Sequence, residues 1–231
     1  MLNKDSIALL QSVTNITNSV LISYPITTIT NESKDVLGNI DFSKVDPVGW
    51  EEFGIFDLNS FLGAVGILEE PTLTLSNTSL VAADINSSIS FVVSDVSTME
   101  DFTTDPENIT TTCEADSVVE VKIDNNLIAK IRKGVSVFKN LEDLFIVKEG
   151  SDIFLRTGNK ESFARTNNSY QIKLEADVVS GPDFEITLLV NNFLSLPAMD
   201  YTMKVKYNSE YDLHRVTMEN AIYQFVLSLV V

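Results

Sequence analysis

The side chains most often used in catalysis are scarce in this chain of 231 residues. It has one cysteine, Cys113, and one histidine, His214. A Ser-His-Asp triad or a Cys-His dyad needs a histidine beside its nucleophile, and a zinc site needs several histidine or cysteine ligands. One cysteine forms no intrachain disulfide, and no glycine-rich phosphate loop is present. We therefore expect no metal, no cofactor and no catalytic residue.

Carboxylates are the one catalytic residue type in excess. The chain holds 33 Asp and Glu against 16 Lys and Arg, a formal net charge of −17. No pair of acids stands at a spacing that singles it out. The sequence leaves open a carboxylate-only nuclease or glycosidase, but it gives that function no positive support.

The charge is distributed unevenly along the chain. Residues 1–113 carry three basic and sixteen acidic residues, and residues 114–231 carry thirteen and seventeen, so the halves have net charges of −13 and −4. A cluster of cations occurs at Lys130, Arg132 and Lys133. Clustered cations attract phosphates without reading bases. A net charge of −17 therefore does not exclude a nucleic-acid partner, provided that these residues share one face.

Two segments have helical periodicity and would position these residues. In residues 124–135, one side is apolar and comprises Leu127, Ile128, Ile131 and Val135. The other side is polar and comprises Asn126, Ala129, Lys130 and Lys133, with Arg132 at its edge. In residues 3–14, Asn3 suits the N-cap and the apolar side comprises Ile7, Leu9, Leu10 and Val13. Its opposite side presents Lys4, Ala8, Gln11, Ser12 and Asn15.

Most of the remaining chain has the alternation of half-buried strands, which predicts antiparallel sheets. In residues 169–178 the side predicted to be buried comprises Tyr170, Ile172, Leu174, Ala176 and Val178. In residues 201–207 it comprises Tyr201, Met203, Val205 and Tyr207. Residues 144–156 predict a hairpin that turns at 149–151.

Several of these features occur twice, which indicates an internal repeat. Phe53-x-Ile55 and Phe184-x-Ile186 lie 131 residues apart, and the Phe-Leu pairs at 61–62 and 193–194 lie 132 apart. Short helices are expected at 57–68 and 190–196, after an apolar strand in each half. An acidic, Thr-rich stretch separates the halves and reads as an exposed linker. We predict domains at 1–95 and 118–231, joined by a connector at 96–117.

The sequence also bears on the location of the protein. No apolar run approaches the roughly 18 residues that span a bilayer. The first residues include an acid and several polar side chains where a signal peptide needs an apolar stretch. We expect a cytoplasmic protein without a membrane partner.

Four segments resemble the sliding-clamp family of T-even bacteriophages in order and spacing. They are LNKDSIALLQ at 2–11, FGIFDLNSFLG at 53–63, VVEVKIDNNLIAKIRKGV at 118–135 and IVKEG at 146–150. The resemblance extends over essentially the whole chain. It implies an α+β DNA-clamp fold, similar in build to the proliferating cell nuclear antigen, with two similar domains that each have antiparallel sheets and two helices. It also implies that three subunits close head to tail into a pseudo-six-fold ring around duplex DNA.

In that family the ring is a processivity factor in the cytoplasm of the infected bacterium. The resemblance therefore implies four partners: double-stranded DNA, a DNA polymerase, an ATP-dependent clamp loader and further copies of the same chain. The helices would line the hole, and the DNA-facing residues would be Lys4, Ala8, Gln11, Ser12, Asn15, Lys130, Arg132, Lys133 and Lys139. Lys160 and Arg165 are weaker candidates. Each lysine alone fits an ordinary solvated helix face, so the hypothesis depends on the cluster in a chain of charge −17.

The family also binds short peptides of its partners in an apolar pocket near the connector. The apolar residues expected there are Met99, Phe102 and Ile109 in the connector, with Tyr201 and Phe225 as the floor. The same five residues also fit core packing or pinning of the connector, and for Tyr201 and Phe225 that interpretation is favoured. The connector departs from the family pattern because it is acidic and poor in proline.

Two other functions stay open from the sequence. An all-β structural or adhesion protein of a virion fits the acidity and the abundance of Thr, Asn and Ser, but not the basic helix or the doubled short helix. The carboxylate enzyme ranks last.

Overall fold

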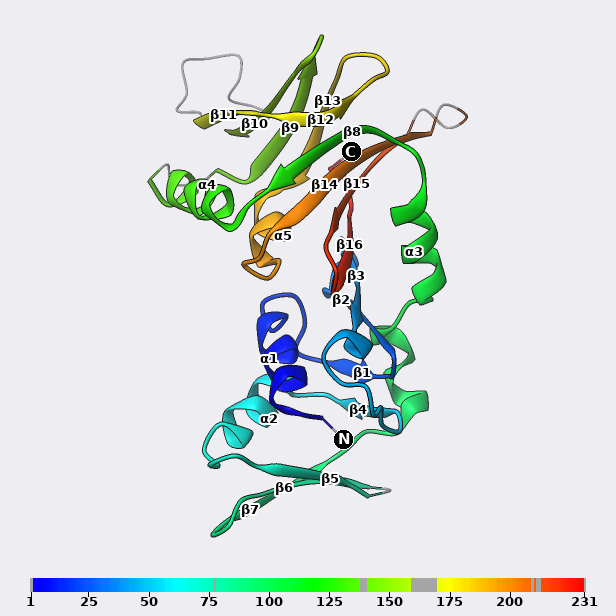
Figure 1. Ribbon diagram of the computed structural model, residues 1–231, viewed down its shortest axis with the longest axis vertical. Coiled ribbons are helices and arrows are strands. Elements are labelled where there is room, and N and C mark those ends of the chain that lie inside the picture. Colours follow the sequence, from blue (N-terminus) through cyan, green and yellow to red (C-terminus); the bar gives the residue numbers. More distant parts are fainter. Residues whose placement is uncertain are drawn as a thin grey trace. The chain divides into compact units, whose positions relative to one another are not determined.

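The computed structural model describes residues 2–76, 78–137, 141–158, 170–208, 210 and 213–230. The chain divides into two compact units (Figure 1). Unit 1 comprises Met1–Thr110 with Ala221–Tyr223, and unit 2 comprises Thr111–Asn220 with Gln224–Val231. No helix within the described ranges is long and apolar enough to cross a membrane.

Unit 1 contains short antiparallel strands and two α-helices of its own. The helices are α1 (Lys4–Ser12) and α2 (Leu58–Val65), with the 3-10 helices η1 (Phe42–Lys44) and η2 (Val96–Phe102) and the start of α3 (Pro106–Glu114). The strands are β1 (Val20–Ile22), β2 (Ile26–Thr30), β3 (Val36–Asp41), β4 (Phe53–Ile55), β5 (Thr72–Leu75), β6 (Ser79–Ala83) and β7 (Ser88–Val92). β1 pairs with β4, β2 pairs with β3, and β5, β6 and β7 form a meander.

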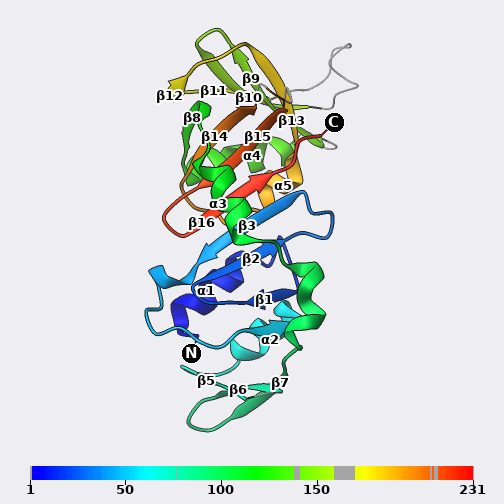
Figure 2. The ribbon, with the colours of Figure 1, turned by 90° about the vertical axis from the view of Figure 1, so that its right-hand side faces the viewer.

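Side-chain caps start both helices of unit 1. The Asn3 side chain accepts a hydrogen bond from the Ser6 amide at 2.8 Å, and the Asp57 side chain accepts one from the Ser60 amide at 3.0 Å. Each bond satisfies a backbone N–H that has no partner within its helix. The hydrogen bonds from Ser60 also lower the pKa of Asp57, so this cap stays ionised. α1 and α2 lie next to each other in both views (Figures 1 and 2).

Unit 2 repeats this plan with longer strands. Its helices are α4 (Asn125–Val137) and α5 (Val190–Ser195), with the end of α3. The strands are β8 (Ser117–Ile123), β9 (Asp143–Glu149), β10 (Asp152–Gly158), β11 (Tyr170–Leu174), β12 (Ala176–Val179), β13 (Phe184–Leu189), β14 (Tyr201–Asn208), β15 (Leu213–Glu219) and β16 (Tyr223–Leu227). One sheet has the order β11-β10-β9-β13, and a second series has the order β12-β8-β14-β15-β16.

The predicted repeat is confirmed at its short helices. β4 is followed by α2, and β13 is followed by α5. The phenylalanines of the two Phe-Leu pairs, Phe61 and Phe193, are each only 1% exposed. Each short helix therefore inserts its phenylalanine into the core of its own unit. The predicted α+β class, with antiparallel sheets and two helices in each half, is confirmed.

The prediction of one strand over 169–178 is wrong. β11 pairs with β10, whereas β12 pairs with β8 in the other series. Glu175 lies between the two strands, so the alternation continues through a change of sheet, and Val178 is 38% exposed instead of buried. The hairpin at 144–156 is confirmed, because Glu149 pairs with Asp152 and Gly150 takes a positive φ of 61° in the turn.

The strand expected at 201–207 is confirmed as β14, with Tyr201, Met203 and Val205 buried. Two residues differ from the prediction. Tyr207 is only half-buried, and Lys206, on the side predicted to face water, is 6% exposed. The Lys206 ammonium donates hydrogen bonds to the carbonyl oxygens of Cys113, at 2.8 Å, and of Ala115. It therefore caps the C-terminus of α3, and burial lowers the pKa of Lys206.

The connector at 96–117 is largely exposed, as expected, but three of its apolar residues are buried. Its residues form η2 and α3, in which Met99, Ile109 and Cys113 are 0%, 1% and 1% exposed. η2 approaches β4 closely at Gly54. A Cβ added to Gly54 would lie 2.5 Å from Met99 Cγ and 3.0 Å from Ser94 Cβ. The glycine of the Phe53-x-Ile55 motif thus leaves the space that Met99 fills.

We expect Gly54→Ala to destabilise the protein, because Met99 must move out of its packed position. Overpacking of this kind costs about 1–3 kcal/mol in the free energy of unfolding, measured by urea denaturation. Gly63→Ala is the matched control. Its Cβ would meet nothing within 4 Å on the exposed side of α2, so we expect a gain of up to about 1 kcal/mol. Equal effects of the two substitutions would contradict the packing role of Gly54.

Candidate nucleic-acid interface

α4 has one buried side and one basic side, as its periodicity predicts. Asp124 Oδ1 accepts a hydrogen bond from the Leu127 amide at 2.7 Å, and Asp200 Oδ1 accepts one from the Asn125 amide at 2.9 Å. Ile128 and Ile131 are 2% and 1% exposed. Because a helix turns by 100° per residue, their burial places the side chains of Asn126, Ala129, Lys130 and Lys133 in solvent, and all four are exposed.

Arg132 is positioned differently from the two lysines. It is half-buried, and its Nη2 donates a hydrogen bond to the Leu194 carbonyl oxygen at 3.0 Å. This bond joins α4 to α5. The guanidinium contributes positive charge to this region, but its first role in the structure is to hold two helices of unit 2 together.

The two lysines are not neutralised by neighbours. Within the described ranges, no carboxylate lies within salt-bridge distance of Lys130 or Lys133. Both ammonium groups therefore present their full charge to solvent. Two adjacent cations on one helix, without a side chain positioned to read a base edge, suit contact with phosphates of any sequence.

α1 presents a nearly neutral surface. Lys4, Ala8, Gln11 and Asn15 are exposed, as predicted. Ser12 is half-buried, and its Oγ donates to the Leu9 carbonyl oxygen at 2.6 Å and lies 2.7 Å from Tyr223 Oη. The Ser12 hydroxyl thus binds within unit 1. Burial raises the pKa of Tyr223, so this pair stays uncharged.

No family model and no curated protein sequence matches this chain. Solved structures do. The chain superposes on the Helicobacter pylori beta clamp bound to a DNA ligase peptide with a TM-score of 0.61 and 12% identity, covering 98% of this chain and 64% of that one. It superposes on the proliferating cell nuclear antigen of Entamoeba histolytica with a TM-score of 0.65 and 11% identity, covering 97% and 94%. It superposes on the proliferating cell nuclear antigen of A. fulgidus, bound to the C-terminal region of FEN-1, with a TM-score of 0.67 and 9% identity. This match covers 97% of this chain and 94% of that one. The chain has the sliding-clamp fold.

The clamp fold accounts for the whole described chain, although identities of 9–12% show the fold alone. This chain spans about two thirds of the beta clamp and nearly all of the two nuclear antigens. An all-β architecture is contradicted by the five α-helices of the described part.

One of the predicted DNA-facing residues, Lys139, lies outside the described residues, and so do the weaker candidates Lys160 and Arg165. The roles of the others at DNA stay predictions. Most of these side chains are exposed on α1 or α4. Ser12 and Arg132 instead form hydrogen bonds within their own unit, with Tyr223 and Leu194.

The five residues predicted for a partner-peptide pocket fall into different environments. In unit 1, Met99 and Ile109 are buried, while Phe102 is half-buried and its ring lies 5.8 Å from that of Phe56. In unit 2, Tyr201 and Phe225 are 3% and 0% exposed, with ring centroids 6.2 Å apart. Four of the five are thus core residues, which agrees with the core-packing interpretation. A shared pocket for all five stays a prediction.

Phe102 does line a hollow that sequence reasoning missed. This loop hollow has a volume of about 660 Å³ and lies in unit 1 between residues 14–19, residues 30–34 and Phe102. A second, smaller hollow of about 310 Å³, the strand hollow, is lined mainly by apolar residues, including Phe56 after β4, Phe61 of α2 and Val92 of β7. The only sequence signal for the loop hollow is clustering of Asn, Ser and Thr in two turns, which has no periodicity.

The potential catalytic groups are engaged elsewhere. Burial raises the pKa of the Cys113 thiol to about 12, so it carries no thiolate near neutral pH. His214 packs between the rings of Phe184 and Tyr207, with centroids 4.9 and 4.8 Å away. Among the described residues, no three His, Cys, Asp or Glu side chains are grouped to hold a metal ion.

We expect the three cations of α4 to differ in their effect on stability. Lys130→Ala and Lys133→Ala should change the free energy of unfolding by less than about 0.5 kcal/mol, since both side chains are exposed. Arg132→Ala should lower it by about 1–2 kcal/mol because the Leu194 carbonyl oxygen loses a charged donor. Urea denaturation of the three variants measures this. A destabilised Lys130 or Lys133 variant would mean that the lysines also have a structural role.

Proposed function

We propose that the protein is a DNA sliding clamp of the T-even bacteriophage type, which tethers a DNA polymerase and catalyses no reaction. The observation that carries the proposal is the exposure of Lys130 and Lys133, which form no ion pair with any described residue, on a helix of a chain with the clamp fold. In a ring, cations on such helices attract the phosphates of an enclosed duplex, while the net negative charge of the chain, −17, repels DNA from other surfaces. Apart from Lys4, α1 would present mainly small or polar, uncharged side chains to the duplex.

The partners follow from this role. They are double-stranded DNA, the replicative DNA polymerase, an ATP-dependent loader that opens the ring, and further copies of the chain, in the cytoplasm of an infected bacterium. The clamp acts by keeping the polymerase at a high effective concentration near the primer end. The H. pylori and A. fulgidus clamps hold peptides of a DNA ligase and of FEN-1, which supports partner binding through short segments.

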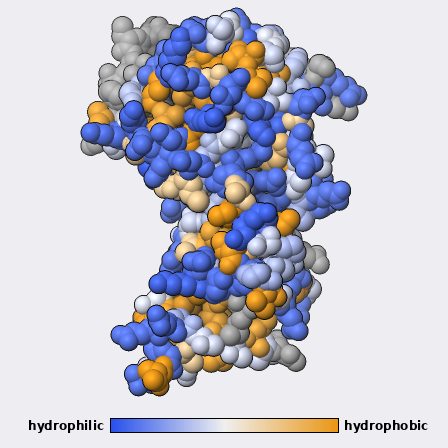
Figure 3. Space-filling model, viewed as in Figure 1, coloured by the Kyte–Doolittle hydropathy of each residue, from blue (hydrophilic) through white to orange (hydrophobic). Residues whose placement is uncertain are grey.

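Ring closure needs different surfaces on the two sides of each subunit junction. Several strands lie at the edge of a sheet, among them β7 in unit 1 and β11 in unit 2. β7 exposes Val92 at 88% and lies beside the strand hollow, and the β6–β7 turn carries Ile85 at 94%. Figure 3 shows apolar surface at the end of unit 1 that contains this meander. Pairing β7 of one copy with β11 of the next would cover these residues and both edges.

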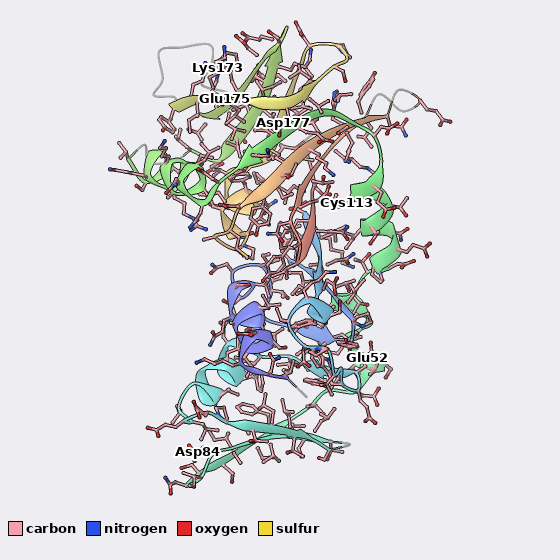
Figure 4. All side chains as sticks on the ribbon, in the orientation of Figure 1. Glu52, Asp84, Cys113, Lys173, Glu175 and Asp177 are labelled. Carbon is pink, nitrogen blue, oxygen red and sulfur yellow. The ribbon has the colours of Figure 1, made fainter. Side chains whose placement is uncertain are left out.

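Charge favours the same head-to-tail junction. Contact between two copies of the first half would bring together surfaces of charge −13 each, whereas head-to-tail contact sets −13 against −4. Figure 4 labels Asp84, at the β6–β7 turn, and Lys173, on β11. Backbone hydrogen bonds from Asn86 and Glu69 lower the pKa of Asp84, so it is an anion near neutral pH.

Retention on DNA of different topology tests the proposal. A closed ring should remain on circular duplex DNA during gel filtration and should be lost when one restriction cut makes the DNA linear. The double substitution Lys130→Glu and Lys133→Glu should weaken polymerase stimulation and leave the free energy of unfolding unchanged. Equal retention on circular and linear DNA would contradict the clamp.

Val92→Asp tests the junction. It puts a charge at the exposed edge of β7, so we expect native mass spectrometry to show the trimer replaced by monomer, with an unchanged circular dichroism spectrum. Val48→Asp is the matched control, because Val48 is 82% exposed but lies outside β7. A trimer that survives Val92→Asp as well as it survives Val48→Asp would move the junction elsewhere.

A further inference from the structure

α4 contains one glycine, Gly134, which directly follows Lys133 and lies one helical turn after Lys130 and Ile131. Glycine inside a helix weakens it relative to alanine, because the glycine backbone loses more conformational freedom on folding. A glycine at such a position therefore indicates that another group approaches the helix closely. The structure shows which group this is.

The ring of Tyr170, the first residue of β11, lies on Gly134. A Cβ added to Gly134 would lie 2.7 Å from Tyr170 Cδ1 and 3.2 Å from its Cε1 and Cγ. Carbon atoms of packed side chains do not approach each other as closely as the first of these distances. The ring thus occupies the space that any larger residue at position 134 would need, directly against the backbone of α4.

Tyr170 is itself fixed by the neighbouring strand, β10. It pairs with Thr157, which is 2% exposed. Thr157 Oγ1 also donates a hydrogen bond to the Tyr170 carbonyl oxygen at 3.4 Å. The backbone that carries the ring is therefore part of the four-stranded sheet of unit 2, and the ring connects this sheet to α4.

The contact lies where α4 has few other anchors. Side-chain caps hold the start of the helix, and Ile131 is its last described residue that is fully buried. After it, Lys133, Ser136 and Val137 are exposed, and Val135 is only half-buried. The position of the last turns therefore depends on the ring that rests against their glycine.

We infer that Tyr170 is a positioning residue for Lys133. Its ring, packed on Gly134, holds the last turns of α4 and with them the direction of the Lys133 ammonium. The inference rests on the proposed function for its consequence at DNA, because it names a residue outside α4 on which the basic side of the helix depends. Tyr170 acts through the helix and not by contact with DNA.

Hydrogen exchange of the full chain, followed by mass spectrometry, tests the contact. Tyr170→Ala should accelerate exchange in residues 132–137 about ten-fold, because the last turns of α4 lose the ring that packs on them. Tyr170→Phe keeps the ring and should leave this exchange unchanged. Residues 58–65 of α2 belong to unit 1 and serve as the internal control, with equal exchange in all variants.

Gly134→Ala should have opposite effects in two backgrounds. While Tyr170 is present, the added Cβ displaces the ring, so exchange in residues 132–137 should become faster. In the Tyr170→Ala background the space is free, and alanine should slow exchange about two- to five-fold by strengthening the helix. Effects of the same sign in both backgrounds, or unchanged exchange in Tyr170→Ala, would overturn the inference.

The consequence at DNA is measured as polymerase stimulation by variants that native mass spectrometry shows to be trimeric. Lys133→Ala should weaken stimulation less in the Tyr170→Ala background than in the wild-type chain, because the ammonium is then no longer held in one direction. Lys4→Ala, on α1, is the matched control and should have the same effect in both backgrounds. Gly134→Ala leaves β11 intact and replaces Tyr170→Ala if that variant does not form the trimer.

An undiminished effect of Lys133→Ala in the Tyr170→Ala background would contradict the positioning role. The exchange measurement needs no DNA, so failure of the clamp proposal is distinguishable from failure of this inference. Loss of the difference between circular and linear DNA would reject the clamp and leave the exchange result standing.

Discussion

The burial of Ile128 and Ile131 is the interaction on which the basic surface depends. These two side chains hold one side of α4 against unit 2, and helical geometry then fixes Lys130 and Lys133 on the other side. Two caps at the start of α4 and the bond from Arg132 to Leu194 restrain the helix further. Loss of this packing would leave the lysines in solvent but would no longer keep them on a common face.

A second constraint is the large negative charge. At −17, the surface of the protein repels nucleic acid, so contact with DNA requires a place where cations are local and unpaired. Most other lysines do not meet this condition. Lys148 and Lys204 pair with Asp183 and Glu219, at 3.2 and 2.9 Å, and Lys206 binds the end of α3. The paired lysines stabilise unit 2, whereas the positive charges of Lys130 and Lys133 are not neutralised by any described carboxylate.

The features that were predictable from the sequence are those with a local cause. The period of 3.6 located α1 and α4, and the side of α4 that it assigned to the core holds Ile128 and Ile131. The turn at Gly150 was predictable because a two-residue hairpin needs a residue with positive φ there. The two short helices, α2 and α5, were predictable because a Phe-Leu pair follows an apolar strand in each half of the sequence.

The features that were missed depend on distant segments. The alternation through residues 169–178 is unbroken, and only the partners of β11 and β12 show that the chain changes sheet at Glu175. Lys206 stands at a position that the alternation assigns to water, and only the end of α3 buries it. The loop hollow is formed by two turns and a residue some 70 positions away, so no window of the sequence contains it.

The small number of cations is itself consistent with the proposed ring. A protein that must find and hold a DNA site by affinity needs many phosphate contacts, and each contact slows movement along the duplex. A closed ring is held by topology, so it requires only enough attraction to keep the duplex in the hole. In the proposed clamp, Lys130 and Lys133 on α4, which pair with no described carboxylate, and Lys4 on α1 would meet that requirement without a side chain that binds one base sequence more tightly than another. The weak and unspecific field of α4 is therefore a condition for sliding in the proposed clamp.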